Sequence, residues 1–585
     1  MISTRLKLLL ALLVVAGLAI VARASMQNET YLPVVYNFIP SNTPTSTKTP
    51  TLTFTPKNTI TDTPTPTNTH TPTPTNTVTP SPTATLTQDP IPTVQVNSMV
   101  EIEMIGPTST GMGTPNPFLI EVEVTFTGPV GQTFVVQGFY DGDGVGGMDG
   151  SIWKVRFTAD APGEWNFLSS SQESLLNGYS GAFNAVNPSD CEQYSPGGMP
   201  DFSCLGRLEY SGDHYLSFAN GQYWFKGGVN DPEDFLVPGN TVGFPTKEDA
   251  IDFLAANGIN SLYMLFNNIE GDGSDLYPWV GDTPFTAKNN HERYDLAKLA
   301  EWKNVFDYLQ SKGLVLHLVF EDDSAWTGFN RQLYYREMIA RFGHYNGLIW
   351  NVSEEFNENY PDANEIKAFA QMIKDLDAYD HPLTVHQVGV LTTWDPFLGD
   401  TRFDLTSFQT PLLPLDQHNA NAVEWFDKVE DSGRTIPVSF DEIRYFDILD
   451  TSDSRHAIWA VYMGGAIHEL RINPDTDYLP FEQHMVDLHT AREFMEQLPY
   501  WQMQPMNYLL EAGQGYVFAK SGEVYSVYLP VGGQIDLNLI GTDATFDGQW
   551  FNPRNVAYQD IGAITGGSVL TFTAPSTEDW VLLLQ

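Results

Sequence analysis

Between residues 205 and 500 the sequence alternates short apolar runs with longer amphipathic stretches, and this alternation constrains the fold more than any other feature. Continuous apolar runs are typical of parallel strands that are buried on both faces, and amphipathic stretches predict helices that cover the sheet. The predicted strands are 224–229, 260–265, 314–320, 348–352, 383–387, 405–409, 437–440 and 458–466. The main predicted helices are 247–257, 294–312, 330–342, 364–379 and 420–431.

Eight such units suit a (β/α)8 TIM barrel, which needs roughly 250 residues. A doubly wound sheet alternates in the same way, but no G-x-G-x-x-G follows its first predicted strand. Short alternating runs separated by Gly and Pro predict a β-sandwich on each side of the barrel, at 95–190 and 510–585. In the first of these, Asp141 to Gly144 resembles the start of a calcium loop. Val145 stands where a third oxygen ligand is needed, so a Gly-rich hairpin loop is predicted instead.

The first part of the chain predicts export. Residues 1–24 combine Arg5 and Lys7 with an apolar run and an Ala22-Arg23-Ala24 cleavage site, as in a signal peptide. A retained membrane anchor is the alternative, although the run is short for a bilayer. Residues 25–94 are rich in Thr and Pro and predict a disordered, extended stalk, or else a plain linker. We therefore expect a secreted protein or one attached to the cell surface through this stalk.

Charge and cysteine content exclude several classes of protein. The chain has 72 acidic and 29 basic residues, a formal net charge of −43, and such a surface repels nucleic acid. Cys191 and Cys204 are too few for a structural zinc site, and in an oxidising compartment they predict one loop-closing disulfide; two free thiols are the alternative. With no P-loop, no G-x-S-x-G and no cluster at metal-ligand spacing, we expect no cofactor and no metal.

Carboxylates follow two of the predicted strands. Glu354 and Glu355 come directly after the fourth strand, and Glu442 follows the seventh. Active sites of TIM barrels lie at the C-terminal ends of strands, and glycoside hydrolysis needs one protonated and one ionised carboxyl group. The structural alternatives are a solvated helix N-terminus for Glu354 and Glu355, and an ion pair with Arg444 for Glu442.

Other polar or aromatic side chains near strand ends are candidates for substrate binding. For the acidic residues Glu321 to Asp323 the alternative role is calcium binding. For His386 the alternative is a buried core residue whose hydrogen bonds are made within the protein. Trp279, Trp326 and Trp394 lie in predicted loops, where they either stack on sugars or pack the loop. The full set of substrate-binding candidates is Asn230, Asp231, Asn267, Asn268, Glu321, Trp350, His386, Gln409 and Tyr445, the last of which is predicted to hydrogen-bond the nucleophile.

Motifs outside the barrel resemble a known family. Residues 139–144, 153–157 and 162–165 are similar to the small β-sandwich of unknown function that precedes apiosidase-like glycoside hydrolases. Residues 549–554 and 579–583 resemble the C-terminal domain of the same group, which is sometimes labelled collagen-binding. The resemblance covers residues 97–585.

The resemblance implies roles for the carboxylates. In this glycosidase clan the acid/base Glu lies five positions after the Trp of strand four, which corresponds to Trp350 and Glu355, and the nucleophile after strand seven corresponds to Glu442. The clan usually has Asn before the acid/base, whereas this chain has Glu354, so Glu354 is the alternative acid. The resemblance implies a secreted, monomeric, retaining glycoside hydrolase acting on a polysaccharide or glycan. The alternatives are a non-catalytic carbohydrate-binding or adhesion protein on a degenerate barrel, and a module that binds a matrix protein through the C-terminal domain.

Overall fold

The computed structural model describes residues 91–585 apart from 232, 234, 272, 323–325, 412, 444–450 and 473–476. All of these described residues belong to one compact unit, Pro50–Gln585. The predictions for the signal peptide, for the stalk up to residue 90 and for Asp323, Arg444 and Tyr445 lie outside the described residues. Within the described part, no helix is both long and apolar enough to cross a membrane.

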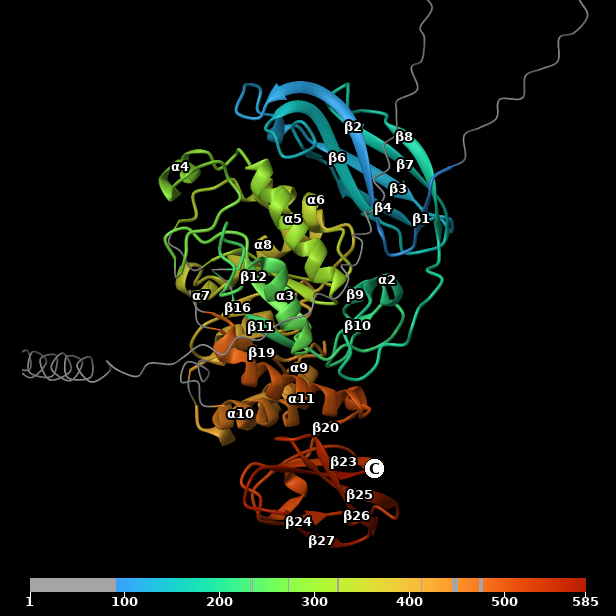
Figure 1. Ribbon diagram of the computed structural model, residues 1–585, viewed down its shortest axis with the longest axis vertical. Helices are drawn as coiled ribbons and strands as arrows, with labels where there is room; N and C mark the ends of the chain where they lie inside the picture. Colours follow the sequence, from blue (N-terminus) through green and yellow to red (C-terminus); the bar gives the residue numbers. More distant parts are fainter. Residues whose placement is uncertain are drawn as a thin grey trace, which may run out of the picture. The chain divides into compact units, whose positions relative to one another are not determined.

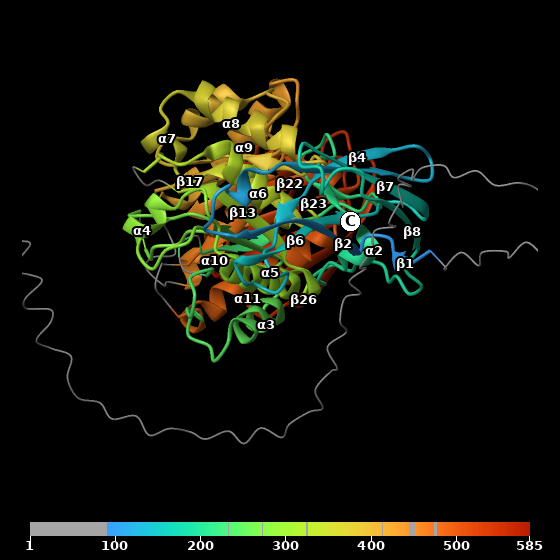
Figure 2. The same cartoon turned by 90° about the horizontal axis from the view of Figure 1, so that it is seen from above.

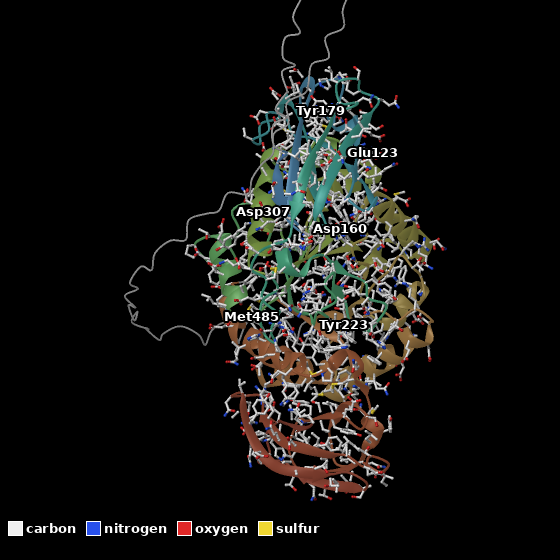
Figure 3. All side chains as sticks on the ribbon, turned by 90° about the vertical axis from the view of Figure 1, so that its right-hand side faces the viewer. Glu123, Asp160, Tyr179, Tyr223, Asp307 and Met485 are labelled. Carbon is white, nitrogen blue, oxygen red and sulfur yellow. A yellow bond between two sulfur atoms is a disulfide. The ribbon has the colours of Figure 1, made fainter. Side chains whose placement is uncertain are left out.

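The N-terminal domain consists of two β-sheets (Figure 1). In β3 apolar residues alternate with exposed ones, which buries one face of its sheet. The hydroxyl of Tyr179 (labelled in Figure 3) joins the two sheets, because it accepts from the Ile105 N–H at 2.9 Å and donates to the Ile105 carbonyl at 3.1 Å. The five-stranded sheet has the order β1 (Thr93–Gln95), β8 (Ser180–Val186), β7 (Gly163–Ser171), β3 (Val122–Thr127), β4 (Thr133–Gln137), and the three-stranded sheet the order β2 (Met99–Thr110), β6 (Asp149–Thr158), β5 (Phe139–Tyr140).

The loop between β5 and β6 is a hairpin loop, as predicted. The carboxylate of Asp143 accepts hydrogen bonds from the N–H groups of Val145 at 2.9 Å and Gly147 at 2.8 Å. The Asp143 side chain therefore helps to close the turn, in the manner of an Asx turn, together with backbone hydrogen bonds such as that from the Gly144 N–H to the Asp141 carbonyl at 2.7 Å.

A nearly closed parallel barrel follows the N-terminal domain. The two ends of its sheet, β15 and β16, are separated in the chain only by Val385. Every adjacent pair of strands in the sheet is parallel. The sheet order is β15 (Leu383–Thr384), β14 (Leu348–Ser353), β13 (Val315–Glu321), β12 (Ser261–Leu265), β11 (Gly227–Asn230), β19 (Ile467–Arg471), β18 (Ser439–Ile443), β17 (Ser407–Thr410), β16 (His386–Gln387).

Helices surround these strands, and Figure 2 shows α5, α6, α8 and α9 placed around β13 and β17. Side-chain caps fix several helix starts: Thr246, Asp295 and Asn330 each accept a hydrogen bond from a backbone N–H of the first turn. The long helices are α3 (Lys247–Ala256), α5 (Leu296–Ser311), α6 (Arg331–Phe342), α8 (Ala363–Leu376), α9 (Leu415–Asp431), α10 (Thr451–Met463) and α11 (Glu482–Glu496), and the short ones are α2 (Phe202–Leu205), α4 (Pro284–Asn289) and α7 (Phe356–Asn359).

The predicted strand at 458–466 is wrong. Residues 451–463 form helix α10, and the last barrel strand is β19, which begins at Ile467. All seven residues from Ala457 to Met463 are fully buried, because α10 lies between the other barrel helices and the C-terminal domain, where Trp459 stacks on Tyr528 with ring centroids 5.4 Å apart. A helix that is apolar all round has no polar face, so its sequence lacks the helical period.

The C-terminal domain is an antiparallel β-sandwich with its own hydrophobic core between two sheets. Arg455 on α10 also pairs with Asp579 at 3.0 Å, which ties this domain to the barrel. The larger sheet has the order β20 (Gln504–Pro505), β22 (Tyr516–Lys520), β23 (Val524–Leu529), β28 (Trp580–Leu584), β25 (Thr545–Asn552), β26 (Ala557–Thr565), and the smaller one the order β21 (Leu510–Ala512), β24 (Gln534–Asn538), β27 (Val569–Thr573).

The segment between the N-terminal domain and the barrel carries a disulfide. Cys191 and Cys204 are bonded, with an Sγ–Sγ distance of 2.16 Å. It also contains the hairpin of β9 (Leu208–Glu209) and β10 (Ser217–Phe218).

Candidate active site

Glu442 is a buried carboxylate near the C-terminal end of a barrel strand, and side chains of two other strands contact it. It lies in β18, its side chain is 5% exposed, and Arg471 at the end of β19 places Nε 2.9 Å from its Oε1. His386 of β16 places Nε2 3.7 Å from Oε2. The other ring nitrogen of His386 lies 2.9 Å from the Ser407 hydroxyl, which orients the ring.

These neighbours set the charge of Glu442. Burial by itself raises the pKa of this carboxyl group, but the contacts with His386 and Gln409 and the positive charge of Arg471 outweigh burial and hold the pKa below its ordinary value. Glu442 is therefore ionised at neutral pH although it is buried. A buried, ionised carboxylate at a strand end has the properties of a nucleophile.

Two more carboxylates reach the same place. Glu354 is 6% exposed, and its carboxylate, a ring nitrogen of His386 and the carboxylate of Glu442 offer atoms that all lie within 4.8 Å of one another. Glu355 is partly exposed and receives a hydrogen bond from Gln409 Nε2. Since Gln409 also hydrogen-bonds Glu442, it links the ends of β14 and β18 through a single side chain.

The backbone of Glu355 is strained. Its φ is 36° and its ψ is 43°, a left-handed conformation that a residue with a Cβ adopts at a cost of about 1–3 kcal/mol. The turn comes between the end of β14 at Ser353 and the start of α7 at Phe356. It allows two consecutive glutamates to approach the same group of side chains.

Two predicted asparagines are buried at neighbouring strand ends. Asn230 ends β11 and Asn267 follows β12, and both are fully buried. Neither side-chain amide has a hydrogen-bond partner among the described residues. Asn230 lies in register with Arg471, which contacts Glu442. Because a buried amide without a partner costs about 1–3 kcal/mol, both asparagines are suited to binding a ligand.

Other predicted site residues have different partners. Tyr478 donates to the Asp231 carboxylate, and the Asn268 amide donates to the Ser274 carbonyl at 3.1 Å. Trp350 is fully buried and donates to Asp377 at 3.2 Å, so it faces the helices outside the barrel.

The Glu321 carboxylate contacts Arg331 at 2.6 Å, Tyr360 at 2.7 Å and Tyr335. The Asp322 carboxylate accepts from the Ile269 N–H at 3.2 Å. With the cation of Arg331 already on Glu321, we do not assign calcium to this pair.

The three predicted stacking tryptophans differ in exposure. Trp279 and Trp394 are fully buried, and Trp394 donates to the Val385 carbonyl at 2.9 Å, so these two pack their loops. Trp326 is partly exposed and lies edge-on to Trp279 at 5.4 Å between ring centroids. Of the three, Trp326 has ring surface left for a ligand.

The sequence analysis missed a charged cluster inside the barrel. Lys226 is fully buried, and its Nζ lies 2.8 Å from Asp441, 3.0 Å from Glu469 and 3.3 Å from His317. Arg471 was missed as well. Glu469 and Arg471 both belong to β19, so placing the eighth strand at 458–466 left these residues outside the predicted strands.

Two groups among the described residues bring metal-ligating atom types within 4.8 Å of one another: Glu354, His386 and Glu442, and His317, Asp441 and Glu469. In each group a protein cation already contacts the carboxylates. Arg471 lies against Glu442, and Lys226 lies against Asp441 and Glu469. We therefore infer that these two side chains, and not metal ions, supply the positive charge in both groups.

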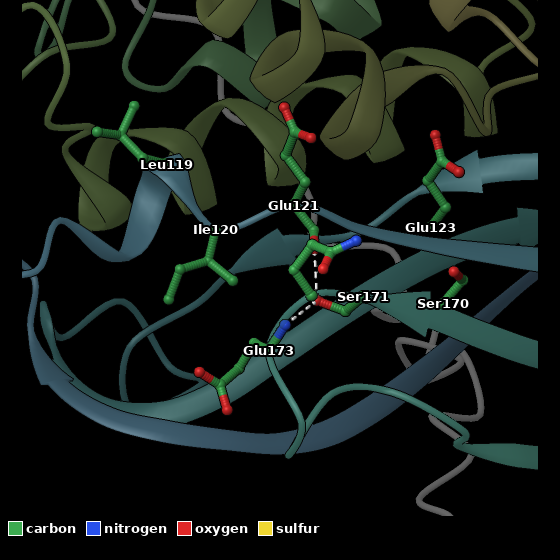
Figure 4. Close-up of a pocket in the computed structure, with 8 residues that line it drawn as sticks. Leu119, Ile120, Glu121, Glu123, Ser170, Ser171 and Glu173 are labelled. Carbon is green, nitrogen blue, oxygen red and sulfur yellow. Dashed lines mark hydrogen bonds between the residues drawn. The ribbon is translucent and has the colours of Figure 1, made fainter.

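Apart from the candidate active site, a pocket of about 490 Å³ lies on the N-terminal domain (Figure 4). Glu121, Glu123 and Glu173 line it together with serines of β7. The Ser171 hydroxyl donates to the Glu121 carbonyl at 2.6 Å, and the Glu121 carboxylate pairs with Arg336 at 3.0 Å. These contacts are structural, and we assign no reaction to this hollow.

Comparisons with known proteins agree with this layout. The family model described as "Domain of unknown function (DUF5060)" matches residues 93–172, and the model described as "Putative collagen-binding domain of a collagenase" matches residues 509–585. No protein with a curated description matches the sequence significantly.

Solved structures with a similar fold are described as glycoside hydrolases. The chain is similar to "a putative glycoside hydrolase from Bacteroides vulgatus", with a TM-score of 0.66, 15% identity, and coverage of 84% of this chain and 99% of that one. It is also similar to a glycoside hydrolase family 5 protein from the same organism, with a TM-score of 0.53, 16% identity, and coverage of 67% and 95%. A third structure, described as "Glycoside hydrolase", gives a TM-score of 0.52 at 16% identity, with coverage of 67% and 98%. At these identities the likeness establishes the fold: the chain has the fold of glycoside hydrolases.

Proposed function

We propose that this protein is a secreted, retaining glycoside hydrolase that cleaves a polysaccharide or glycan in a (β/α)8 barrel. The observation that carries the proposal is the buried Glu442, kept ionised by Arg471, His386 and Gln409 with two further carboxylates beside it. The fold shared with glycoside hydrolases supports the same assignment.

In the proposed mechanism Glu442 attacks the anomeric carbon and forms a glycosyl-enzyme intermediate. Glu355 protonates the leaving oxygen and then removes a proton from the attacking water. Retention needs the two carboxyl groups about 5–5.5 Å apart, whereas inversion needs roughly 6.5 Å or more to admit a water. Gln409 contacts both Glu355 and Glu442, and this shared neighbour favours the shorter spacing.

Exposure favours Glu355 over Glu354 as the acid. A general acid has to reach the glycosidic oxygen, and Glu355 is partly exposed while Glu354 is 6% exposed beside the nucleophile. Glu354 then takes the place where the family has a sugar-binding Asn, and it contacts the sugar next to the reacting carbon.

The test is a panel of neutral plant and microbial polysaccharides treated with the wild-type chain and with Glu442→Gln. We expect oligosaccharides from at least one polymer, and a rate about 10⁴-fold lower for Glu442→Gln. Glu358→Gln is the matched control, since Glu358 is an exposed glutamate of α7 and should leave the rate unchanged. Equal hydrolysis by the wild type and Glu442→Gln would remove Glu442 from the mechanism. A wild type that binds glycans without hydrolysing any would support the carbohydrate-binding alternative.

A second experiment, with an aryl glycoside that has a good leaving group, identifies which of the two glutamates is the general acid/base. Such a substrate needs no protonation to form the intermediate, so loss of the acid/base slows only the second step. With added azide, Glu355→Gln should release a glycosyl azide of retained configuration, while Glu354→Gln should release none. The opposite result would exchange the two roles.

A second candidate function is binding of a matrix protein, favoured by the family model that matches residues 509–585. Retention of the full chain on immobilised collagen, with no retention on polysaccharide, would support it.

A further inference from the structure

The strand that carries Glu442 is irregular at the preceding residue. Between β17 and β18, Phe408 pairs with Phe440 but Gln409 pairs with Glu442, so Asp441 is an extra residue in β18. This is a β-bulge in a parallel pair, which is rare, and bulges next to active sites commonly re-aim a side chain.

The bulge explains how Asp441 and Glu442 both point into the barrel. In a regular strand successive side chains point to opposite faces. Ser439 faces the interior, where its hydroxyl lies 3.2 Å from Lys226 Nζ, and Phe440 faces outward against Phe408 at 5.5 Å between ring centroids. Asp441 faces the interior again, so regular alternation would turn Glu442 outward. The extra residue instead lets Glu442 reach His386 and Arg471.

Asp441 is anchored deep in the barrel. Its Oδ1 lies 2.8 Å from Lys226 Nζ and also accepts from the Ser439 hydroxyl, and all three side chains are fully buried. Attraction between opposite charges is strong in such a low-dielectric place, so this contact resists displacement.

The anchor extends to other barrel strands. Glu469 of β19 is the second carboxylate on Lys226, and it accepts from the Ser261 hydroxyl of β12 at 2.6 Å. His317 of β13 lies 3.3 Å from Lys226 and 3.2 Å from the Asn351 amide of β14. Burial and the charge of Lys226 hold the pKa of His317 well below its usual range, so His317 stays neutral.

We propose that Asp441 and Lys226 are positioning residues: their buried ion pair fixes the bulge in β18 and so aims Glu442 at the reacting carbon. This inference rests on the proposed function, because it assigns Glu442 the role of nucleophile. Both side chains are fully buried and already paired with each other, so we assign neither of them a contact with the substrate.

The direction in which the pKa of Glu442 changes in an Asp441 variant distinguishes a positioning role of Asp441 from a simple charge effect. The charged or titratable groups facing Asp441 are Lys226, His317, His468 and Glu469. Those facing Glu442 are Arg471, His386 and Glu354, with Tyr263 near both carboxylates. If Asp441 acted through its charge alone, Asp441→Asn would remove a neighbouring negative charge and lower the pKa of Glu442. If it positions Glu442, the variant loses the contacts with Arg471 and His386, and the pKa of Glu442 rises.

The experiment compares wild type, Asp441→Asn and the control Glu337→Gln on a hydrolysed substrate. Glu337 is equally buried and pairs with Arg341 at 3.1 Å, but it lies on α6 away from β18. We expect Asp441→Asn to lower kcat about 100-fold with little change in KM, as for a misplacement of about 1 Å, and to move the acid limb of the profile to higher pH. Glu337→Gln should lower the thermal midpoint without moving the acid limb.

A second readout does not depend on turnover. Titration of ¹³C-labelled glutamate carboxyl groups, with the Glu442 signal assigned by its loss in Glu442→Gln, gives the pKa of Glu442 directly. A higher pKa in Asp441→Asn supports the proposal even if the proposed function fails, whereas a lower or unchanged pKa overturns it. Should Asp441→Asn fold poorly, Lys226→Met/Asp441→Asn removes both buried charges together, and the same rise in pKa is expected there.

Discussion

The Arg471–Glu442 pair offers the sharpest test of the site. Arg471→Gln removes the positive charge while keeping a side chain of similar reach. The two atoms are 2.9 Å apart, and the side chains are 18% and 5% exposed, so water screens the contact only partly. Coulomb attraction at this distance is about 6 kcal/mol at an effective dielectric constant of about 20, which is an upper bound.

The net effect is smaller because the free guanidinium and carboxylate would be solvated. A hydrogen bond to a charged group contributes about 1.5–3 kcal/mol net, which corresponds to roughly a 10- to 150-fold loss in kcat/KM. The loss depends on pH in a definite direction. Arg471 helps to hold the pKa of Glu442 below its ordinary value, so removing it raises that pKa. Because the ionised form attacks, the acid limb of the activity profile moves to higher pH, and the variant loses more activity at pH 5 than at pH 8.

The assay is kcat/KM across pH 4–9 for the wild type, Arg471→Gln and the control Arg331→Gln. Arg331 matches Arg471 closely, with a side chain 17% exposed and a carboxylate, that of Glu321, at 2.6 Å. Arg331→Gln should reduce stability and leave the acid limb in place. The reasoning fails if Arg471→Gln keeps the wild-type acid limb, or if Arg331→Gln shifts it equally.

Three further predictions concern stability. Trp459→Ala should lower the free energy of unfolding, measured with urea, by about 3–5 kcal/mol, because it leaves a cavity between α10 and the C-terminal domain. Trp326→Ala, at a partly exposed ring, should lower it by less than about 1 kcal/mol. Replacing Cys191 and Cys204 by Ser should cost about 3 kcal/mol, and reductant should lower wild-type stability by the same amount but leave the variant unchanged. Burial raises the pKa of Asp487 from 3.8 to about 6, so its ionisation weakens the fold progressively between these two pH values. Asp487→Asn should increase the free energy of unfolding by on the order of 3 kcal/mol at pH 7.5 and leave it nearly unchanged at pH 4.

Seven of the barrel strands could be predicted from the sequence because each is an apolar run between polar turns, and the structure has strands at these seven places. The prediction misplaced the eighth because the second half of helix α10, residues 457–463, is buried on all sides and therefore has no polar face. What covers that helix is the C-terminal domain, a contact between residues 459 and 528 that no local window contains. The true strand β19 carries the polar residues His468, Glu469 and Arg471, which interrupt the apolar run expected of a buried strand.

The candidate site, too, could be predicted only in part. Glu354, Glu355 and Glu442 were predicted from their position after strands, and the structure brings them together with His386 and Gln409. Glu321 also ends a strand, yet its carboxylate is held by Arg331, and Trp350, within β14, faces Asp377. Position after a strand does not specify the direction of a side chain. That direction depends on alternation and on bulges such as the one at Asp441, which arise from pairing between strands.

The local charges of the site bear on the choice of substrate. Glu354, Glu355 and Glu442 lie close together, with Arg471 as the cation that contacts Glu442, and Arg471 is already committed to that carboxylate. A uronic acid bound at the reacting position would bring a negative charge next to the ionised Glu442, which repels it in a poorly solvated place. The formal net charge of −43 adds long-range repulsion of a polyanion during encounter. We therefore expect a neutral polysaccharide to be cleaved faster than the same backbone carrying uronic acids, with a rate for the charged polymer that recovers as salt is raised from 20 to 500 mM. Faster cleavage of the charged polymer at low salt would contradict this account of the site.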